Sequence, residues 1–275
     1  MGTLYVVATP IGNLEDITLR ALRILRSVGL IAAEDTRATR RLLSHYDIHT
    51  PLTSYFEHNK LTKLDQILTT LREKDVAIVS EAGTPGISDP GYELIRAAIE
   101  LGVEVVSVPG ASAVVAALAI SGLPTDRFVY VGFMPRRRAD RKRSLERLAS
   151  ATQTVVAFEA PHRVVEALED IRAVLGNRRI AVAREVTKVH EEVVRGSVDE
   201  VLQHFASRPP RGELTLIIAG AAPAAVEPDE ETLKRRLGEL AAQGLGGKEA
   251  VRRVVEETGV PKRRLYRLWV RMTST

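Results

Sequence analysis

Residues 76–91 read VAIVSEAGTPGISDPG and carry the clearest fold signal in the chain. Residues 76–80 form a short apolar run, which predicts a buried strand. The next eleven residues contain three glycines and two prolines. They lead into residues 92–101, whose apolar periodicity predicts a helix that stops at Gly102. A strand, a loop and a helix in this order are the repeating unit of a parallel sheet covered by helices.

The same unit recurs on both sides of this stretch. Strands are predicted at residues 3–9, 30–33 and 103–108, and helices at residues 16–28, 60–73 and after residue 113. Each strand runs into a loop rich in Gly, Pro, Ser or Asp, at residues 10–13, 34–37 and 109–113. Because the carboxyl ends of parallel strands share one edge of a sheet, these loops predict a ligand-binding edge. Tight βα turns, which also favour Gly and Pro, are the alternative explanation.

The pattern changes beyond residues 121–127. Five strands are predicted at residues 128–133, 154–159, 179–185, 191–198 and 213–219, with one strong helix among them at residues 163–175. Strands this dense favour a mixed sheet in a second domain. The predicted α/β organisation is therefore an N-terminal domain over residues 1–121, a mixed-sheet domain over 122–222, and a linker with a basic helical extension over 223–275.

The C-terminal extension begins with a small, Pro-containing linker at residues 221–229. Three short helices are predicted at residues 231–243, 248–257 and 261–271, with glycines in the turns between them. This is helix-turn-helix-like spacing, which many helical appendages share.

Composition and charge exclude several classes of protein. The 275 residues include no cysteine, which removes disulfides, thiolate metal sites and a cysteine nucleophile. No dinucleotide or P-loop glycine motif is present, the histidines lack metal-ligand spacing, and we predict no metal. No apolar run approaches a membrane span and no basic leader precedes the first strand, so we expect a cytoplasmic protein.

The net charge of +4 is concentrated in two segments. Residues 136–147 hold 7 basic and 2 acidic residues, and residues 229–275 hold 11 basic and 7 acidic residues. Such segments favour a polyanionic partner, although a solvated helix face gives the same pattern.

Five motifs together resemble a known family: TPIGNL at residues 9–14, AEDTR at 33–37, SEAGTPGISDPG at 80–91, VPGAS at 108–112 and FEAPHR at 158–163. In order and spacing they are similar to the small-subunit ribosomal RNA methyltransferase I family, within the tetrapyrrole-methylase-like (class III) S-adenosylmethionine-dependent methyltransferases. The resemblance covers residues 1–220 and, more loosely, the helical tail. It implies two α/β domains with the methyl donor in the cleft between them, a homodimer, and 2′-O-methylation of a cytidine ribose in the decoding region of 16S rRNA.

The resemblance also implies which residues bind S-adenosylmethionine. They lie in the loops after the strands and at the ends of two late strands: Pro10, Glu81, Ala82, Gly83, Thr84, Pro85, Gly110, Ala111, Ser112, Phe158, Glu159, Ala160, Leu214 and Thr215.

A ribose hydroxyl is a poor nucleophile, so a base or a stabilising charge is expected beside it. Our catalytic candidates are Lys188, to deprotonate or stabilise the hydroxyl, and Glu185 or Asp35, to orient it. Structural ion pairs are the alternative role for all three.

The basic segments are expected to bind phosphates of 16S rRNA or of the 30S ribosomal subunit. The predicted RNA-binding residues are Arg136, Arg137, Arg138, Arg141, Lys142, Arg143, Arg252, Arg253, Lys262, Arg263 and Arg264. Two other functions stay open. One is methylation of a tetrapyrrole carbon, which acidic or neutral cleft surroundings without a basic tail would favour. The other is a non-catalytic helix-turn-helix sensor that binds nucleic acid.

Overall fold

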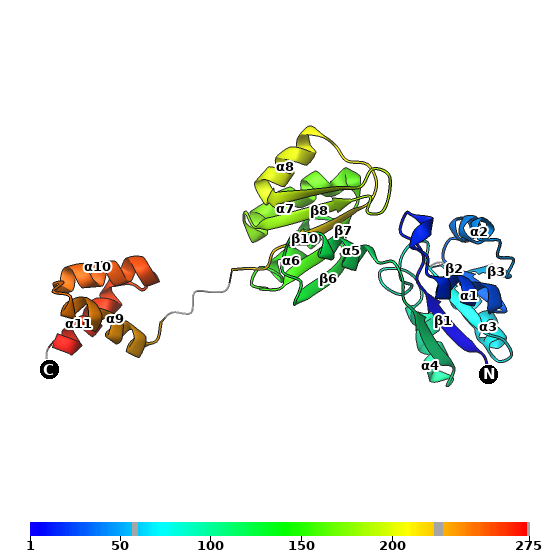
Figure 1. The fold of residues 1–275 in the computed structure, drawn as a ribbon, viewed down its shortest axis with the longest axis horizontal. Helices are drawn as coiled ribbons and strands as arrows, with labels where there is room; N and C mark the ends of the chain where they lie inside the picture. The colour runs from blue at the N-terminus through cyan, green and yellow to red at the C-terminus, as the bar shows by residue number, and fades with distance from the viewer. Residues whose placement is uncertain (57–59, 223–227, 274–275) are drawn as a thin grey trace. The chain divides into compact units, whose positions relative to one another are not determined.

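The computed structural model describes residues 1–56, 60–222 and 228–273. It divides into two units, Met1–Ala221 and Ala222–Thr275. The first unit contains two five-stranded sheets, and the second contains three helices (Figure 1). The predicted linker at residues 221–229 includes residues 223–227, which lie outside the described residues.

The first sheet is parallel throughout and has the strand order β3-β2-β4-β1-β5. Its strands are β1 (Thr3–Val7), β2 (Leu30–Ala33), β3 (Leu52–Ser54), β4 (Val76–Val79) and β5 (Glu104–Val108). Because β4 lies between β2 and β1, and β5 flanks β1, the four predicted loops lie at neighbouring strand ends.

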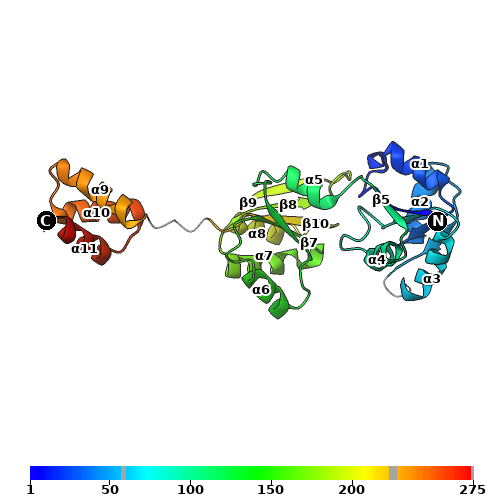
Figure 2. The same cartoon turned by 90° about the horizontal axis from the view of Figure 1, so that it is seen from below.

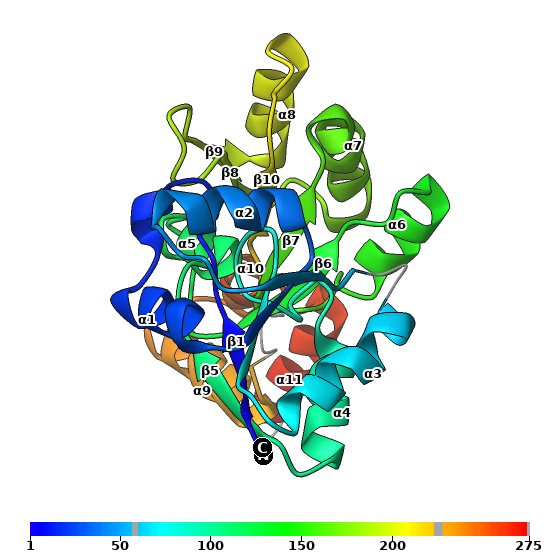
Figure 3. The ribbon, with the colours of Figure 1, turned by 90° about the vertical axis from the view of Figure 1, so that its right-hand side faces the viewer.

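Helices cover both faces of this sheet (Figure 2). Helix α1 (Leu19–Ser27) packs on one face, while α3 (Lys60–Leu71) and α4 (Tyr92–Glu100) pack beside each other on the opposite face (Figure 3). Strand residues alternate between the two cores: Ile31 and Ala33 face α1, and Ala32 faces α3 and α4. This two-sided burial explains why the inner strands β2 and β4 are apolar runs without polar alternation.

Two elements of this half were not predicted. Strand β3 is a three-residue edge strand. Helix α2 (Thr36–His45) follows β2 directly; Asp35 caps it by accepting hydrogen bonds from the backbone N–H groups of Arg37 and Ala38. The cap residue and the buried Thr39, Leu42 and Leu43 are the sequence signal that could have revealed α2.

The second sheet is mixed, with the strand order β6-β7-β10-β8-β9. Its strands are β6 (Phe128–Phe133), β7 (Thr154–Glu159), β8 (Arg179–Arg184), β9 (Glu192–Ser197) and β10 (Leu214–Ile218). Strands β6 and β7 are parallel and the other pairs are antiparallel. All five strands agree with the predicted ones to within a residue or two.

One face of the second sheet carries α6 (Arg138–Glu146), α7 (Val164–Leu175) and α8 (Val198–Ser207). Helix α8, which was not predicted, begins with a capping box between Ser197 and Glu200. The other face carries α5 (Ala113–Ala119), whose Val114, Ala117 and Leu118 pack on β7, β8 and β10. The predicted boundary after residue 121 placed α5 in the domain of the first sheet. In the structure the apolar face of α5 packs on the second sheet and completes its core. The chain therefore passes from the first sheet to the second before α5.

The second unit is a three-helix cluster of α9 (Glu230–Ala242), α10 (Gly247–Thr258) and α11 (Lys262–Thr273). Its core includes Leu237, Val251 and Leu265, with Trp269 packed against it. Gly259 ends α10 in the left-handed conformation, as a residue at this position commonly does. Across the residues that the structure describes, no helix is long and apolar enough to span a membrane.

Candidate functional site

The loops after β1 and β4 are joined by a pair of backbone hydrogen bonds. Thr9 N–H donates to the carbonyl of Gly83 at 2.9 Å, and Gly83 N–H donates to the carbonyl of Thr9 at 3.0 Å. Gly83 has a φ of +85°, a backbone conformation that residues with a side chain rarely adopt. The bridge holds the predicted donor-binding loop against the end of β1.

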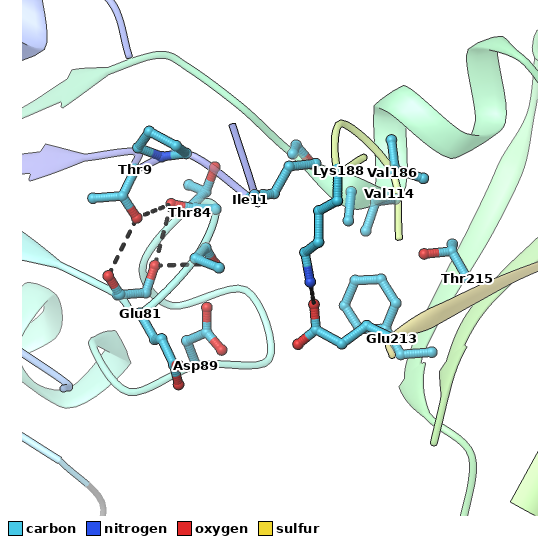
Figure 4. A pocket seen from close by; sticks show the side chains of 18 of the residues that line it. Thr9, Ile11, Glu81, Thr84, Asp89, Val114, Val186, Lys188, Glu213 and Thr215 are labelled. Carbon is cyan, nitrogen blue, oxygen red and sulfur yellow. Dashed lines mark hydrogen bonds and ion pairs between the residues drawn. The ribbon is translucent and has the colours of Figure 1, made fainter. Parts of the chain in front are cut away.

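A pocket of about 720 Å³ opens at this edge of the first sheet, and the second sheet supplies its opposite wall (Figure 4). Eleven predicted donor-binding residues line it: Pro10, Glu81, Ala82, Gly83, Thr84, Ser112, Phe158, Glu159, Ala160, Leu214 and Thr215. Pro85, Gly110 and Ala111 do not line it. A Cβ on Gly110 would come within 3.0 Å of the Ala8 Cβ, so a glycine here permits close packing against the residue that follows β1.

Two of the three catalytic candidates, Lys188 and Glu185, also line the pocket. Lys188 Nζ lies 2.8 Å from Glu185 Oε1 and 3.4 Å from Glu213 Oε2. Partial burial lowers the pKa of Lys188, but the hydrogen bonds and negative charges of these two glutamates outweigh it and raise the pKa above its usual value. Lys188 is therefore a cation at neutral pH and cannot act as a general base there.

Glu185 is committed to structural bonds. Its Oε1 accepts from Lys188 Nζ and from the backbone N–H of Glu213 at 3.1 Å. Although burial raises the pKa of Glu185, these bonds and nearby positive charges lower it overall. Asp35, the third candidate, does not line the pocket, and its carboxylate caps α2. The geometry therefore favours a structural role for Asp35.

The loop that carries Lys188 is held in a strained conformation. Glu185 and Thr187 have φ angles of +52° and +73°, which are uncommon for residues with a side chain and unusual for a β-branched one. The Thr187 hydroxyl accepts a hydrogen bond from the backbone N–H of Asn13 at 3.2 Å. A Cβ on the neighbouring Gly12 would overlap the Lys188 side chain, coming within 2.9 Å of its Cε. Gly12 therefore leaves the space through which Lys188 reaches the pocket.

The pocket lining is acidic overall. It contains six Asp or Glu residues and two Lys or Arg residues. Burial raises the pKa of Asp89 to about 7, and the negative charges of Glu34, Glu81 and Glu213 contribute, while a hydrogen bond from Ser80 opposes the rise. Asp89 thus changes charge near neutral pH.

Glu159, at the end of β7, is a buried pocket residue with unused bonding capacity. Its Oε1 accepts from the backbone N–H of Ala160 at 2.7 Å and is paired with Arg163, whereas its Oε2 is buried without a hydrogen-bond partner. Burial raises the pKa of Glu159, against the opposing effects of these partners. A free buried oxygen in a pocket wall suits a ligand that donates a hydrogen bond.

The predicted RNA-binding residues around α6 differ in availability. Arg136 and Arg137 are exposed, but Arg138 donates to Asp170 at 2.9 Å, Lys142 lies 3.8 Å from Asp170 and Arg143 pairs with Asp140. Arg141 is a correction to the prediction: it is fully buried, and its Nε and Nη2 lie 2.9 and 2.7 Å from Asp170 Oδ2. In this structure it anchors α6 to α7 and cannot reach a phosphate.

The predicted RNA-binding residues of the tail lie on α10 and α11. Arg252, Arg253, Lys262 and Arg263 are exposed, and Arg264 is half-buried. Arg252 is paired with Glu249 and lies 3.9 Å from Glu256. This surface is therefore mixed in charge.

The residues present fit S-adenosylmethionine. The donor carries a positive sulfonium and an ammonium group, which suit an acidic pocket of this size. Phe158 and the glycine loops offer an apolar surface and a closely approachable backbone. Within the described part of the chain, no three His, Asp or Glu side chains are grouped to hold a metal ion.

Sequence reasoning missed several pocket residues, among them Arg41, Asp89 and Glu213. Asp89 lies inside the quoted loop motif, so its position at a strand end was a usable signal. Arg41 belongs to the unpredicted α2, and Glu213 meets Lys188 only through the pairing of β8 with β10. The acidic lining also means that the basic character expected of an RNA enzyme lies outside the pocket.

Comparison with known proteins agrees with this fold. The model of the Tetrapyrrole (Corrin/Porphyrin) Methylases matches residues 3–202, and the chain belongs to this family. A solved structure of a cobalamin biosynthetic enzyme, cobalt precorrin-4 methyltransferase, superposes with a TM-score of 0.61 at 18% identity, covering 79% of this chain and 94% of that one. At that identity the likeness concerns the fold alone.

Curated relatives within the family are more similar to this chain in sequence. A Synechocystis protein named Ribosomal RNA small subunit methyltransferase I is 47% identical over 98% of this chain and 97% of its own. A Thermotoga maritima protein of the same name is 48% identical over 221 residues, which is 80% of this chain and 99% of that protein. The aligned length equals that of the two-sheet unit, Met1–Ala221.

Proposed function

We propose that this protein is an S-adenosylmethionine-dependent methyltransferase that methylates the ribose 2′-hydroxyl of a cytidine in the decoding region of 16S rRNA. The near-full-length identity of 47% to a protein named for small-subunit rRNA methylation carries the proposal. The 30S subunit, a homodimeric state and the cytoplasm are the partner, assembly and location that go with it. The basic segments, which a tetrapyrrole enzyme would not need, support the rRNA substrate over a corrin or porphyrin.

The pocket holds the donor in this proposal. Backbone groups of the loop after β4 and the wall formed by Phe158, Glu159 and Thr215 would contact it, and the free Oε2 of Glu159 would accept a hydrogen bond. When bound, S-adenosylmethionine supplies a methyl group on a sulfonium, and its transfer to a hydroxyl oxygen releases the hydroxyl proton. The acidic lining favours the cationic donor over its neutral product, which promotes product release.

Lys188 acts electrostatically in this mechanism. As a cation held by Glu185 and Glu213 at the pocket wall, it stabilises negative charge that develops on the acceptor oxygen. Its position is set in advance by the strained loop and by Gly12, so little reorganisation is needed during the reaction.

We infer that Asp89 receives the hydroxyl proton. It lines the pocket and has no cationic partner among the described residues, whereas Glu159 and Glu185 are paired with Arg163 and Lys188. A base works best when its pKa lies near the working pH, and the pKa of Asp89 is about 7. After transfer the proton passes from Asp89 to solvent.

The test of the function is transfer of labelled methyl from S-adenosylmethionine to 30S subunits that lack their native methylations, followed by mapping of the label. Label at a cytidine ribose of the decoding region supports the proposal. Donor binding without transfer to RNA contradicts it, and would favour a tetrapyrrole substrate or a non-catalytic sensor.

The role of Asp89 is tested by the pH dependence of single-turnover methyl transfer. The titratable groups that interact with Asp89 are Glu34, Glu81, Glu213 and Tyr130, and none of them is changed in Asp89→Asn. The wild-type rate should rise with pH through about 7, and the variant should lose both this dependence and most of the rate while binding the donor normally. A variant with the same pH profile as wild type would exclude Asp89 as the base.

A further inference from the structure

Helix α2 presents an arginine cluster that sequence analysis did not single out. Arg37, Arg40 and Arg41 are all exposed. Their spacing of three and four residues places them on one side of the helix. The buried residues of α2 are Thr39, Leu42 and Leu43, so the arginines face away from the core.

These three arginines form no ion pair with another described side chain within 4 Å. Asp35 is the nearby acid, and its carboxylate accepts hydrogen bonds from the backbone N–H groups of Arg37 and Ala38, so it caps the helix and forms no ion pair with a guanidinium of the cluster. Most basic residues of α6, by contrast, are tied to Asp170 or Asp140. The α2 cluster therefore keeps its charge free for a partner.

The position of the cluster on the helix strengthens its positive potential. The first turn of α2 contains no acidic residue, and Arg37 lies there, at the positive end of the helix dipole. Cations at this end are disfavoured for helix stability. The N-cap carboxylate of Asp35 offsets part of this effect, and an anionic partner would offset more of it.

Helix α2 also borders the pocket. Arg41 lines it, together with Ala38, Thr39 and Leu42 from the same helix. Phe133 of β6 lines the same pocket and leaves 58% of its surface exposed, with its ring packed at 5.3 Å on the ring of Phe158. An unpaired arginine and an exposed aromatic ring at one pocket, with two further arginines on the same helix, are the combination by which proteins hold single-stranded nucleic acid.

We propose that the exposed face of α2 is the surface along which the acceptor RNA strand reaches the pocket, with Arg37, Arg40 and Arg41 on its phosphates and Phe133 stacked on a base. This inference rests on the proposed function and names the surface that function uses. Guanidinium groups suit this task because their planar donors match phosphate oxygens. The proposed surface also separates RNA recognition from the chemical step. The acidic pocket binds the cationic donor, and the arginines of α2 beside it bind the polyanionic RNA.

The test compares Arg40→Gln/Arg41→Gln with the matched control Arg20→Gln/Arg23→Gln. The control removes the same charge from exposed positions on α1, a helix that contributes no residue to the pocket. The substrate is 30S subunits lacking native methylations, and KM, kcat and the salt dependence of KM are measured in the full-length protein. Calorimetric titration with S-adenosylmethionine reports on the pocket.

We expect the α2 variant to raise KM about tenfold with little change in kcat, because two solvent-exposed ion pairs with phosphates are lost. The slope of log KM against log salt should fall by about 1.4, from roughly 0.7 per phosphate contact on a single strand. The α1 control should change neither. Phe133→Leu should raise KM without altering the slope, since stacking releases no counterions.

Equal KM and salt slope in the α2 variant and the α1 control would overturn the inference. So would a weakened donor affinity that accounts for the whole loss in the α2 variant, because Arg41 would then serve the donor. If wild-type protein binds the donor but does not methylate 30S subunits, the proposed function itself fails. This failure is distinguishable because it is measured on the wild-type protein, before any variant is compared.

Discussion

Removal of Asp170 provides a quantitative test of the buried ion pair that anchors α6. Asp170 and Arg141 both have completely buried side chains, and Arg141 Nη2 lies 2.7 Å from Asp170 Oδ2. In Asp170→Ala the guanidinium stays buried and keeps only the exposed carboxylate of Glu166, 3.6 Å away, as a counter-charge. Breaking a buried pair in this way costs about 3–5 kcal/mol. For a unit of this size, that corresponds to a fall in Tm of about 6–20 °C.

The assay is urea unfolding followed by far-ultraviolet circular dichroism, with calorimetry for Tm. Trp269 is the single tryptophan and lies in the three-helix unit, so its fluorescence reports on that unit and should be unchanged. The matched control is Asp199→Ala, which breaks the half-exposed pair with Arg172 and should cost at most about 1 kcal/mol.

A double variant separates loss of a charge partner from loss of packing. Arg141→Met/Asp170→Leu removes both charges and should recover most of the stability, because well-packed apolar pairs replace buried ion pairs at little cost. Equal losses in Asp170→Ala and Asp199→Ala would refute the reasoning, and would reopen the prediction that Arg141 is available to RNA.

Three other changes test the pocket. Lys188→Met should lower single-turnover methyl transfer about 10²-fold or more with donor affinity, measured by calorimetry, nearly unchanged; full activity would remove Lys188 from the mechanism. Gly12→Ala should displace the Lys188 side chain and slow methyl transfer by up to about 10²-fold without altering Tm. A normal rate of methyl transfer would show that Lys188 keeps its position despite the added methyl group, and would contradict the role assigned to Gly12. Because the pKa of Asp89 is raised to about 7, the folded state keeps a proton on this side chain at pH values where the unfolded state has lost it. The contribution of Asp89 to the free energy of unfolding is therefore fully present below about pH 4 and is lost as the pH rises toward 7. Asp89→Asn should therefore gain stability relative to wild type as pH rises over this range, and a constant difference in the free energy of unfolding would contradict the assigned pKa.

The strands and most helices could be predicted from the sequence because local signals specify them. Each buried strand of the first sheet is an apolar run, and each long helix has an apolar stripe and a stop residue. Prediction missed β3, α2 and, despite its capping box, α8. The three-residue β3 is too short to show a pattern, and the polar, arginine-rich α2 has few apolar positions.

The sequence by itself determined the order of strands and helices, the loops at one sheet edge and the family resemblance, since all of these depend on residues close together in the chain. Only the tertiary structure decided how charges are used. Lys188 becomes a fixed cation through Glu213, Arg141 becomes buried through Asp170, and Asp89 acquires a pKa near neutrality from acids on separate strands and loops. The physical reason is that desolvation and Coulomb interactions depend on distance and burial in space, which residues far apart in the sequence acquire only on folding.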